Sequence, residues 1–420
     1  MSIHIIIGKN FGDEGKGLAV DYFASMAKSK DQSCLVIRHN GGAQAGHTVE
    51  LPDQKRFVFH QLSSGSFRHA DTFWAENFLP DLYQLSNELK SFEQMCNRKP
   101  KLYASGRCRC VTIDDVLMNM AVETMRGTKR HGSCGMGINE AVERSKHQEF
   151  RLPLAAVKGM SAQDLVIQLK RIRREYLPLR MAEYQKANYR MTDNRMADNQ
   201  IGEYGELLKN DQVLYNAAET MCRFAQTVEI IEAGKVRDYD ELIFEGAQGL
   251  LLDENYLQYA PYLTPSRTGA HYPMEFCKQY LADQARELVY VTRSYVTRHG
   301  AGPLAYEEEF DLLKERFNDQ TNQPNEWQGT LRYALHGTIE EFIAPVLNDF
   351  IQYQDDEDTF GSGMMRSLMV THLNETNHCI YSTTGKIPID MWLALEDVKH
   401  TFDKTYLSAS PYAEKMDLTS

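Results

Sequence analysis

A glycine-rich stretch near the start of the chain combines carboxylates, lysines and many backbone donors. Residues 8–17 read Gly-Lys-Asn-Phe-Gly-Asp-Glu-Gly-Lys-Gly. Glycines let the backbone approach an anion closely, and N–H groups that open a helix bind phosphate. Lys16 supplies a charge for phosphate oxygens, whereas Asp13 is suited to hold Mg²⁺ or to act as a general base. The spacing is not a Walker A motif, because Asn10 stands where that motif needs a glycine.

Four further polar segments have the same character, each with glycine beside hydroxyl, amide, thiol or ring donors. They are residues 38–49, 131–138, 244–249 and 297–303. A short connection with this composition is either a tight structural turn or part of a binding site.

Apolar runs place most of these segments after buried strands. Residues 3–7, 34–37, 242–244 and 288–291 predict strands, and the apolar spacing over residues 18–26 predicts a helix. Short strands at 101–103 and 111–113 and helices over 82–89 and 116–122 extend the alternation. Strands that alternate with helices predict an α/β fold with a mainly parallel sheet flanked by helices, whose ligands gather at the carboxyl ends of the strands.

Composition excludes several classes of protein. The chain has 420 residues, 42% of them hydrophobic and 25% charged, which is typical of a globular protein rather than a disordered or fibrous chain. The formal net charge of −12 disfavours nucleic acid and anionic membrane as partners. No apolar run approaches the roughly 20 residues that span a bilayer, and the first residues lead into a strand. We therefore expect a cytoplasmic protein.

We expect one domain over residues 1–420, with helical elaborations at about 160–225, because no linker or repeat divides the chain. The basic and aromatic residues at 170–195 are interrupted by acids, which favours a solvated helical face over a nucleic-acid surface. The eight cysteines are scattered without zinc-site spacing, and we interpret them as reduced thiols.

Four motifs, taken in order, resemble those of the adenylosuccinate synthetase family almost from end to end. They are Gly-Asp-Glu-Gly-Lys-Gly at 12–17, the segment 40–49 with Ala-Gly-His-Thr-Val, Phe-Glu-Gly-Ala-Gln-Gly at 244–249, and Thr-Arg at 297–298 with Gly-Pro at 302–303. The resemblance implies a large α/β fold related to P-loop proteins, usually a homodimer. It also implies a ligase that joins L-aspartate to the 6-position of inosine monophosphate with GTP and Mg²⁺.

The resemblance also implies roles for individual residues. Asp13 would remove the N1 proton of the purine and ligate Mg²⁺, with the carbonyl of Gly46 as a second ligand. His47 and Lys16 would stabilise the transferred phosphoryl group. The triphosphate would further contact Gly12, Gly15, Gly17, Thr48, His372, Asn374, Ser408 and Ser410. The purine monophosphate would contact Ser133, Cys134, Gln248, Thr264, either Asn40 or Gln44, and Arg144 from the partner subunit.

Two segments depart from the family pattern. At residues 326–333 the family has a loop with three arginines that grips aspartate; Gln328, Thr330 and Arg332 stand there, so only one arginine remains. Asn374 replaces the aspartate that reads guanine. Because an amide offers one donor and one acceptor, it suits adenine, and we hypothesise a shift from GTP toward ATP.

These departures resemble a phage-type branch that makes aminoadenylosuccinate from deoxyguanylate and ATP. We expect that branch to lack Asp13, which this chain retains, so inosine monophosphate stays the first choice and GMP or dGMP the second. A non-catalytic nucleotide sensor is the alternative from another class, and a generic P-loop NTPase is a further one.

Overall fold

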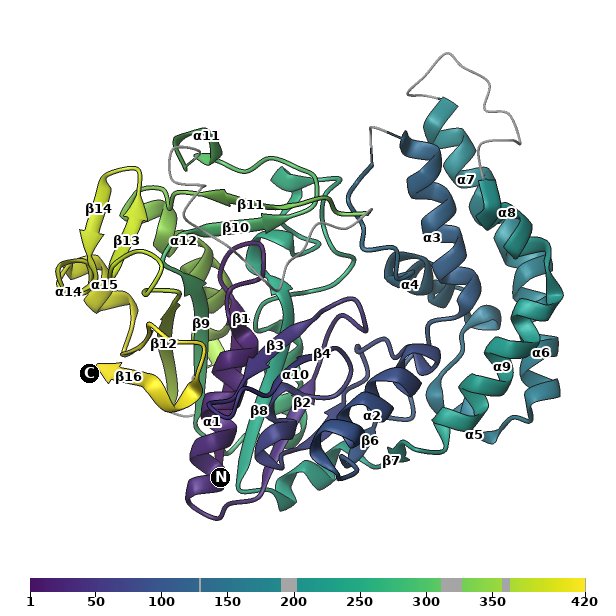
Figure 1. Cartoon of the computed structure of the whole chain (residues 1–420), viewed down its shortest axis with the longest axis horizontal. Helices are drawn as coiled ribbons and strands as arrows, with labels where there is room; N and C mark the ends of the chain where they lie inside the picture. Colours follow the sequence, from purple (N-terminus) through teal and green to yellow (C-terminus); the bar gives the residue numbers. More distant parts are fainter. Residues whose placement is uncertain (128–129, 190–201, 311–326, 357–362, 420) are drawn as a thin grey trace.

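The structure is a computed structural model, and it describes residues 1–127, 130–189, 202–310, 327–356 and 363–419. A ten-stranded sheet forms the centre of the molecule, in the order β16-β15-β12-β9-β1-β8-β2-β5-β6-β7 (Figure 1). All neighbouring strands pair parallel except β15 and β16. This confirms the predicted α/β class. The strands are β1 Ser2–Gly8, β2 Cys34–Arg38, β5 Asp71–Trp74, β6 Leu102–Ala104, β7 Glu229–Ile230, β8 Glu241–Gly249, β9 Arg286–Arg293, β12 Met364–Thr371, β15 Lys404–Ser408 and β16 Met416–Thr419.

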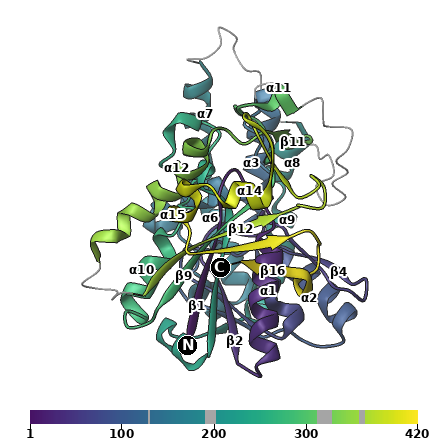
Figure 2. The same ribbon diagram turned by 90° about the vertical axis from the view of Figure 1, so that its left-hand side faces the viewer.

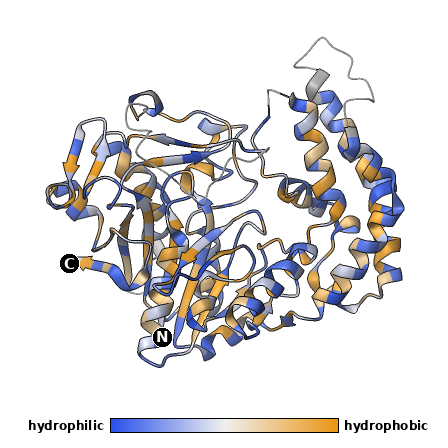
Figure 3. Ribbon diagram, in the orientation of Figure 1, coloured by the Kyte–Doolittle hydropathy of each residue, from blue (hydrophilic) through white to orange (hydrophobic). Residues whose placement is uncertain are grey.

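Both faces of the sheet are buried, as the continuous apolar strands predict. Alternate residues of a strand point to opposite faces. Ile6 packs with Val20 and Phe23 of α1 on one face, while Ile5 belongs to a larger cluster on the other face. That cluster includes residues of α10, α12, α14 and α15. The apolar central strands and the mixed surface of the helices are visible in Figure 3.

The helices occupy both sides of this sheet, as the turned view in Figure 2 shows. Three two-stranded ribbons lie outside it. The helices are α1 Lys16–Ser29, α2 Leu82–Cys96, α3 Ile113–Arg126, α4 Ile138–Lys146, α5 Leu154–Gly159, α6 Ala162–Arg171, α7 Leu177–Tyr189, α8 Gly202–Lys209, α9 Asp211–Ala225, α10 His271–Tyr280, α11 Glu307–Phe310, α12 Ile339–Phe350, α14 Ile389–Leu393 and α15 Glu396–Thr401. The ribbons are β3 His47–Glu50 with β4 Arg56–Phe59, β10 Val296–His299 with β11 Leu331–Ala334, and β13 Cys379–Ser382 with β14 Gly385–Pro388.

The expected helical elaboration is present over the described part of residues 160–225, and residues 190–201 lie outside the description. A π-helical turn, Ile172–Tyr176, joins α6 to α7. Many basic side chains of this region form ion pairs, such as Arg173 with Asp114 and Arg180 with Glu140. No helix among the described residues is long and apolar enough to cross a membrane.

One predicted strand is wrong. Residues 111–113 do not form a strand, because Thr112 is the N-cap of α3. The Thr112 hydroxyl accepts from the backbone N–H of Asp115, and the Asp115 carboxylate accepts from the backbone N–H of Thr112. This reciprocal capping box satisfies free donors at the start of the helix, which outweighs the β preference of Val111 and Ile113.

Candidate active site

A cleft of about 820 Å³ opens at the carboxyl ends of the central strands. The turns after β1, β8, β9 and β12 contribute to it, together with the start of β3. Ligands of parallel α/β sheets bind at this edge. Its lining includes Gly12, Asp13, Glu14, Gly15, Lys16, Gly17, Gln44, Gly46, His47, Thr48, Gln248, Arg293, Gln328, Thr371, His372, Asn374 and Ser410.

The first glycine-rich loop reaches the cleft through conformations that favour glycine. Gly15 has φ of 95° and is the N-cap of α1, so the N–H groups of the first turn have no side-chain cap. Asp13 also has positive φ, 58°, which aspartate tolerates better than most residues. A Cβ on Gly17 would lie 2.8 Å from the Thr48 carbonyl oxygen. The loop therefore depends on glycine where it meets the strand that carries His47.

Two charged side chains of this loop are buried beside the cleft. Lys16 is 3% exposed, and burial lowers the pKa of its ammonium group. Glu14 is 1% exposed, and burial raises the pKa of its carboxyl group. One Glu14 oxygen accepts from the Asn10 backbone N–H at 2.7 Å, and the other has no hydrogen-bond partner in the described chain. A buried amine beside a carboxyl with an unused oxygen is suited to an anionic ligand accompanied by a cation or a proton.

His47 is held by a carboxylate from the neighbouring strand. His47 Nδ1 lies 2.6 Å from Glu245 Oε1, and both side chains are buried. Burial lowers the pKa of His47 to about 4. Burial alone would raise the pKa of Glu245, but Arg38 and the hydrogen bond with His47 hold it at about 2. The pair is therefore a neutral imidazole that donates from Nδ1 to a carboxylate, which leaves Nε2 as the second polar atom of the ring.

The structure distinguishes between the two amides proposed for the purine. Asn40 is fully buried; its Oδ1 accepts from the Ala247 N–H at 2.8 Å, and its Nδ2 donates to the Arg267 carbonyl at 3.0 Å. It therefore holds the end of β8 and does not line the cleft. Gln44 does line it, and neither amide atom of Gln44 has a partner among the described side chains and backbone. Gln248, with φ of 59°, also lines the cleft.

The residues expected at the nucleotide's phosphate do not line the cleft. Ser133 exchanges hydrogen bonds with Asn119, and Cys134 is a free, partly buried thiol whose pKa burial raises to about 11. The backbone N–H of Thr264 donates to the Leu252 carbonyl at 2.9 Å. The predicted contacts of Ser133, Cys134 and Thr264 with a monophosphate therefore remain proposals.

Arg144 requires a correction. It was predicted to reach the nucleotide of a partner subunit, but its side chain is fully buried within its own chain. Its guanidinium forms a bidentate ion pair with Asp115 and donates to the carbonyls of Phe150 and Cys110. Because all of its nitrogens are engaged, it anchors α4 against the start of α3, and it has none left for a ligand.

The segment after β12 lies directly against the first loop. The Thr371 hydroxyl donates to the Glu14 carbonyl at 2.9 Å. His372 has φ of 59°, and Asn374 is an exposed residue at the cleft. Ser410 also faces the cleft, whereas Ser408 is buried and donates to the Ser410 carbonyl at 2.6 Å. Ser408 therefore shapes this segment and does not line the cleft.

Among the residues predicted to bind aspartate, some line the cleft and others do not. Gln328 lines the cleft. Thr330 follows it closely in the sequence, but its side chain is exposed and does not line the cleft. Arg332 already binds a carboxylate, because its guanidinium forms a bidentate ion pair with Glu307 and donates to the Gly302 carbonyl. A substrate carboxylate would have to displace Glu307 to use it.

A magnesium ion fits the donors of the cleft. Asp13 and Gly46 both line it, and no cluster of three His, Cys, Asp or Glu side chains suited to a metal occurs in the described ranges. Mg²⁺ is commonly bound by one or two carboxylates together with substrate phosphates and water, rather than by an all-protein cage. One carboxylate and one carbonyl match that pattern.

Sequence reasoning missed two groups that this geometry makes prominent. Glu14 lies within the motif at 12–17 and Glu245 within the motif at 244–249, but the sequence predicts no role for either. A glutamate next to an aspartate in a loop carries no signal of burial. The contact between Glu245 and His47 spans 198 residues and depends on the order of the strands.

Comparisons with known proteins agree with the fold. The family model for adenylosuccinate synthetase matches residues 5–330. Adenylosuccinate synthetases of Alcanivorax borkumensis and Vibrio vulnificus are 28% and 29% identical over 308 residues, which are 72% of this chain. The alignments cover 64% and 63% of those relatives, so less than two thirds of their length is matched.

Two solved structures share the fold. Fully ligated adenylosuccinate synthetase from Plasmodium falciparum has a TM-score of 0.65 at 17% identity, with 100% of both chains covered. Cyanophage S-2L succinoaminodeoxyadenylate synthetase, bound to dGMP and dATP, has a TM-score of 0.57 at 12% identity, with 99% of this chain and 95% of that chain covered. With the family model matching more than half of its residues, the chain belongs to the adenylosuccinate synthetase family.

Proposed function

We propose that the chain is a ligase that joins L-aspartate to the 6-position of a purine nucleoside monophosphate, driven by GTP or ATP. The observation that carries this proposal is the convergence of Asp13, Lys16 and His47 on one cleft at the end of the parallel sheet, with Glu245 holding the His47 ring from behind. Family membership supports the reaction type.

The reaction has two steps. Asp13 takes the proton from N1 of the purine, which raises electron density on the 6-oxygen. That oxygen attacks the γ-phosphorus, and the nucleoside diphosphate leaves. The amine of aspartate then attacks C6, and inorganic phosphate leaves with the former 6-oxygen. Asp13 and the Gly46 carbonyl would hold Mg²⁺, which neutralises charge on the phosphates when bound.

His47 and Lys16 stabilise the phosphoryl group during transfer. Burial lowers the pKa of His47 to about 4 and so keeps the ring neutral. A bound triphosphate is an anion on one side of the ring, and Glu245 is an anion on the other, so both favour a second proton on His47. The resulting Nε2–H donates to the phosphoryl oxygens, and Lys16 and the first N–H groups of α1 add further donors.

The base of the triphosphate is proposed to meet Asn374. An amide can donate to N1 and accept from N6 of adenine, whereas guanine presents two adjacent donors that suit a carboxylate. We therefore propose that ATP is used at least as well as GTP, with His372 packing on the base and Ser410 contacting it.

Inosine monophosphate is the proposed first substrate, because Asp13 is retained as the base for N1. The second candidate is GMP or dGMP with ATP, favoured by Asn374 and by Gln44, whose amide has no partner in the described chain. The cyanophage protein of similar fold is the one described with dGMP and dATP. A non-catalytic nucleotide sensor is the third candidate, favoured by Arg332, which is engaged by Glu307.

Gln328, Thr330 and Arg332 remain the proposed aspartate contacts, although Thr330 supplies no charge. Homodimerisation and a cytoplasmic location likewise remain predictions. Since Arg144 is engaged within its own chain, a dimer would have to supply a different arginine to the monophosphate.

One matrix of reactions tests these proposals. The purified chain is incubated with Mg²⁺ and aspartate, with IMP, GMP or dGMP crossed against GTP and ATP, and products are identified by mass. Phosphate release that requires both a purine monophosphate and aspartate supports the ligase. Release with triphosphate alone favours an NTPase, and no turnover in any combination, with retained nucleotide binding, favours the sensor.

A further inference from the structure

The carbonyl groups of residues 12–14, in the first glycine-rich loop, are each held by a side chain from a different strand. The Thr297 hydroxyl of β10 donates to the first carbonyl at 3.1 Å, and Arg293 Nε of β9 donates to the second at 2.5 Å. The Thr371 hydroxyl of β12 donates to the third at 2.9 Å. All three side chains are buried. Arg293 and Thr371 end the two strands that follow β1 in the sheet (Figure 1).

These three contacts determine where the N–H groups of the loop point. In a trans peptide, the carbonyl group and the N–H group of the next residue point in opposite directions. The N–H groups of Asp13, Glu14 and Gly15 therefore point away from the side chains that hold the carbonyls. None of these N–H groups donates a hydrogen bond within the described ranges of the chain. Successive N–H groups of this kind form a concave site for anions, so their direction matters for a triphosphate.

Arg293 differs from the two threonines because it contacts a second segment of the cleft. Its side chain is 4% exposed and lines the cleft. Arg293 Nη1 donates to the Tyr295 hydroxyl at 3.0 Å, and that hydroxyl donates to the carboxylate of Glu375, the residue after Asn374. The guanidinium is therefore fixed between the Asp13 carbonyl and the segment proposed to contact the base.

We propose that Arg293 is a positioning residue, which together with Thr297 and Thr371 holds the loop carbonyls and so directs the loop N–H groups and the Asp13 carboxylate toward a triphosphate. Without the Nε donor, the Asp13 carbonyl loses its partner and the peptide that follows Asp13 is free to rotate. The effect on turnover rests on the proposed ligase reaction, whereas the effect on anion binding does not.

Two substitutions at the same position separate the hydrogen bond from the charge. Arg293→Gln and Arg293→Met both remove the positive charge and keep an unbranched side chain. The amide nitrogen of glutamine is bonded to Cδ, as Nε of arginine is, so it can still donate to the Asp13 carbonyl. Methionine has no donor. A difference between the two variants therefore reports the hydrogen bond, whereas an equal loss in both reports direct binding of phosphate by the guanidinium charge.

The measurement is a calorimetric titration of the full chain with inorganic tripolyphosphate in the presence of Mg²⁺, without any purine. We expect Arg293→Met to bind at least about 10-fold more weakly than Arg293→Gln. In the complete reaction, kcat should fall in the same order, with a smaller change in the KM of the purine monophosphate. Equal affinities of the two variants, or no binding by the parent chain up to millimolar tripolyphosphate, would overturn the proposal.

Thr297→Val provides a second variant if Arg293→Met does not fold. Valine keeps the shape of the side chain but removes the hydroxyl that holds the Gly12 carbonyl, so tripolyphosphate should bind several-fold more weakly. Thr401→Val is its matched control, because the Thr401 hydroxyl donates to the Asp397 carbonyl at 2.6 Å within α15. Unchanged affinity in Thr297→Val would contradict the role of the held carbonyls.

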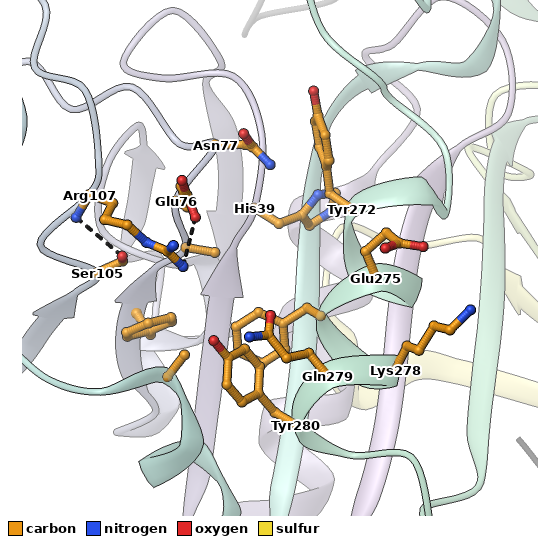
Figure 4. A pocket seen from close by; sticks show the side chains of 14 residues that line it. His39, Glu76, Asn77, Ser105, Arg107, Tyr272, Glu275, Lys278, Gln279 and Tyr280 are labelled. Carbon is orange, nitrogen blue, oxygen red and sulfur yellow. Dashed lines mark hydrogen bonds and ion pairs between the residues drawn. The ribbon is translucent and has the colours of Figure 1, made fainter. Parts of the chain in front are cut away.

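Two arginines outside the cleft are controls for the loss of charge. Arg286 lies at the other end of β9, is 2% exposed and donates to the Gln284 carbonyl at 2.7 Å. Arg107 pairs with Glu76 at 2.9 Å on the wall of a separate cavity of about 250 Å³ (Figure 4). Arg286→Met and Arg107→Met should leave the affinity for tripolyphosphate unchanged. A loss in either that equals the loss in Arg293→Met would refute a specific role for Arg293.

The failure of this proposal can be distinguished from failure of the ligase. If Arg293→Gln and Arg293→Met differ as expected but no purine monophosphate yields product, the positioning role stands and the ligase is refuted. If product forms and the two variants bind tripolyphosphate equally, the ligase stands and the positioning role is refuted.

Discussion

His47 of β3 and Glu245 of β8 form a hydrogen bond of 2.6 Å inside the protein, across 198 residues of sequence. Glu245 also accepts from the hydroxyl of Ser64, and it is the anion nearest to the buried Arg38. One carboxylate thus fixes the orientation of the ring and neutralises a buried cation. The donor proposed for phosphoryl transfer therefore depends on a residue that does not line the cleft.

Glu245→Gln tests this dependence. The amide keeps the size of the side chain but removes the charge that favours protonated His47. We expect kcat to fall by about 10²-fold, as for loss of a transition-state donor, with a smaller change in the KM of the triphosphate. His47→Ala should cost at least as much. In Glu245→Gln, the pH profile of kcat should also lose the part of its pH dependence that comes from protonation of His47.

Glu287→Gln is the matched control for this variant. Glu287 is also a buried carboxylate with a pKa near 2, and it pairs with His4 at 3.0 Å on the distant end of the sheet. Both variants remove a buried carboxylate that is hydrogen-bonded to a histidine and should destabilise the fold. Only Glu245→Gln should slow turnover; equal losses of kcat would mean that stability, and not orientation of His47, is responsible.

Asp13→Asn should reduce product formation by at least about 10²-fold, because the amide cannot take the N1 proton and is a weaker metal ligand. Asparagine tolerates the left-handed backbone at this position, so the loop is retained. Asp31→Asn is the control, since Asp31 has φ of 55° and is exposed in the turn after α1. Undiminished product in Asp13→Asn, measured by mass, would remove Asp13 from both roles.

Asn374→Asp should move triphosphate preference toward GTP. A carboxylate accepts from both donors of guanine, and against adenine it leaves the ring N1 without a donor. A mispaired polar contact costs about 1–3 kcal/mol, so the ratio of kcat/KM for GTP over ATP should rise roughly 5-fold to 150-fold. Asn377→Asp adds the same charge at a neighbouring exposed position and should leave the ratio unchanged.

The free energy of unfolding should depend on pH through the buried neutral histidines. His336 allows the contribution of one such histidine to be tested. Burial, and then the charge of Lys9, lower the pKa of His336 to about 3. The unfolded chain takes up this proton below about pH 6.5 and the folded chain does not, so this contribution is complete above pH 6.5 and is lost as pH falls toward 3.

His336→Gln removes that dependence. Between pH 6 and pH 5, the free energy of unfolding of the parent chain should fall by up to about 1.4 kcal/mol more than that of the variant. Urea unfolding at both pH values measures the free energy of unfolding of each protein. The buried carboxylates contribute equally to both proteins, so their contribution cancels in the difference. Parallel losses in parent and variant would show that His336 is not neutral in the folded state.

The sequence predicted the parallel sheet and the loops at its carboxyl edge because both follow from local patterns. Apolar runs marked β1, β2, β8 and β9, and glycine spacing marked the turns. The prediction for Asp13, Lys16 and His47 depended on motifs within short segments, and all three line the cleft.

The contacts that the sequence could not reveal join distant segments. Nothing in the spacing of Arg144 reveals that Asp115 and two carbonyls occupy it, or that Glu307 binds Arg332. Asn40 and Gln44 lie in one loop and carry the same functional group, and only the three-dimensional arrangement shows which amide is used internally.

The hydrogen bond from Thr371 to the Glu14 carbonyl bears on how this protein can diverge. A Cβ on Gly15 would lie 2.9 Å from the Thr371 methyl group, so the segment proposed to contact the base packs closely against the loop proposed to bind the phosphates. The segment cannot shift to suit another base without disturbing the phosphate loop. Triphosphate preference can therefore change through single side-chain replacements such as Asn374, whereas insertions and deletions at this junction should be rare among its descendants.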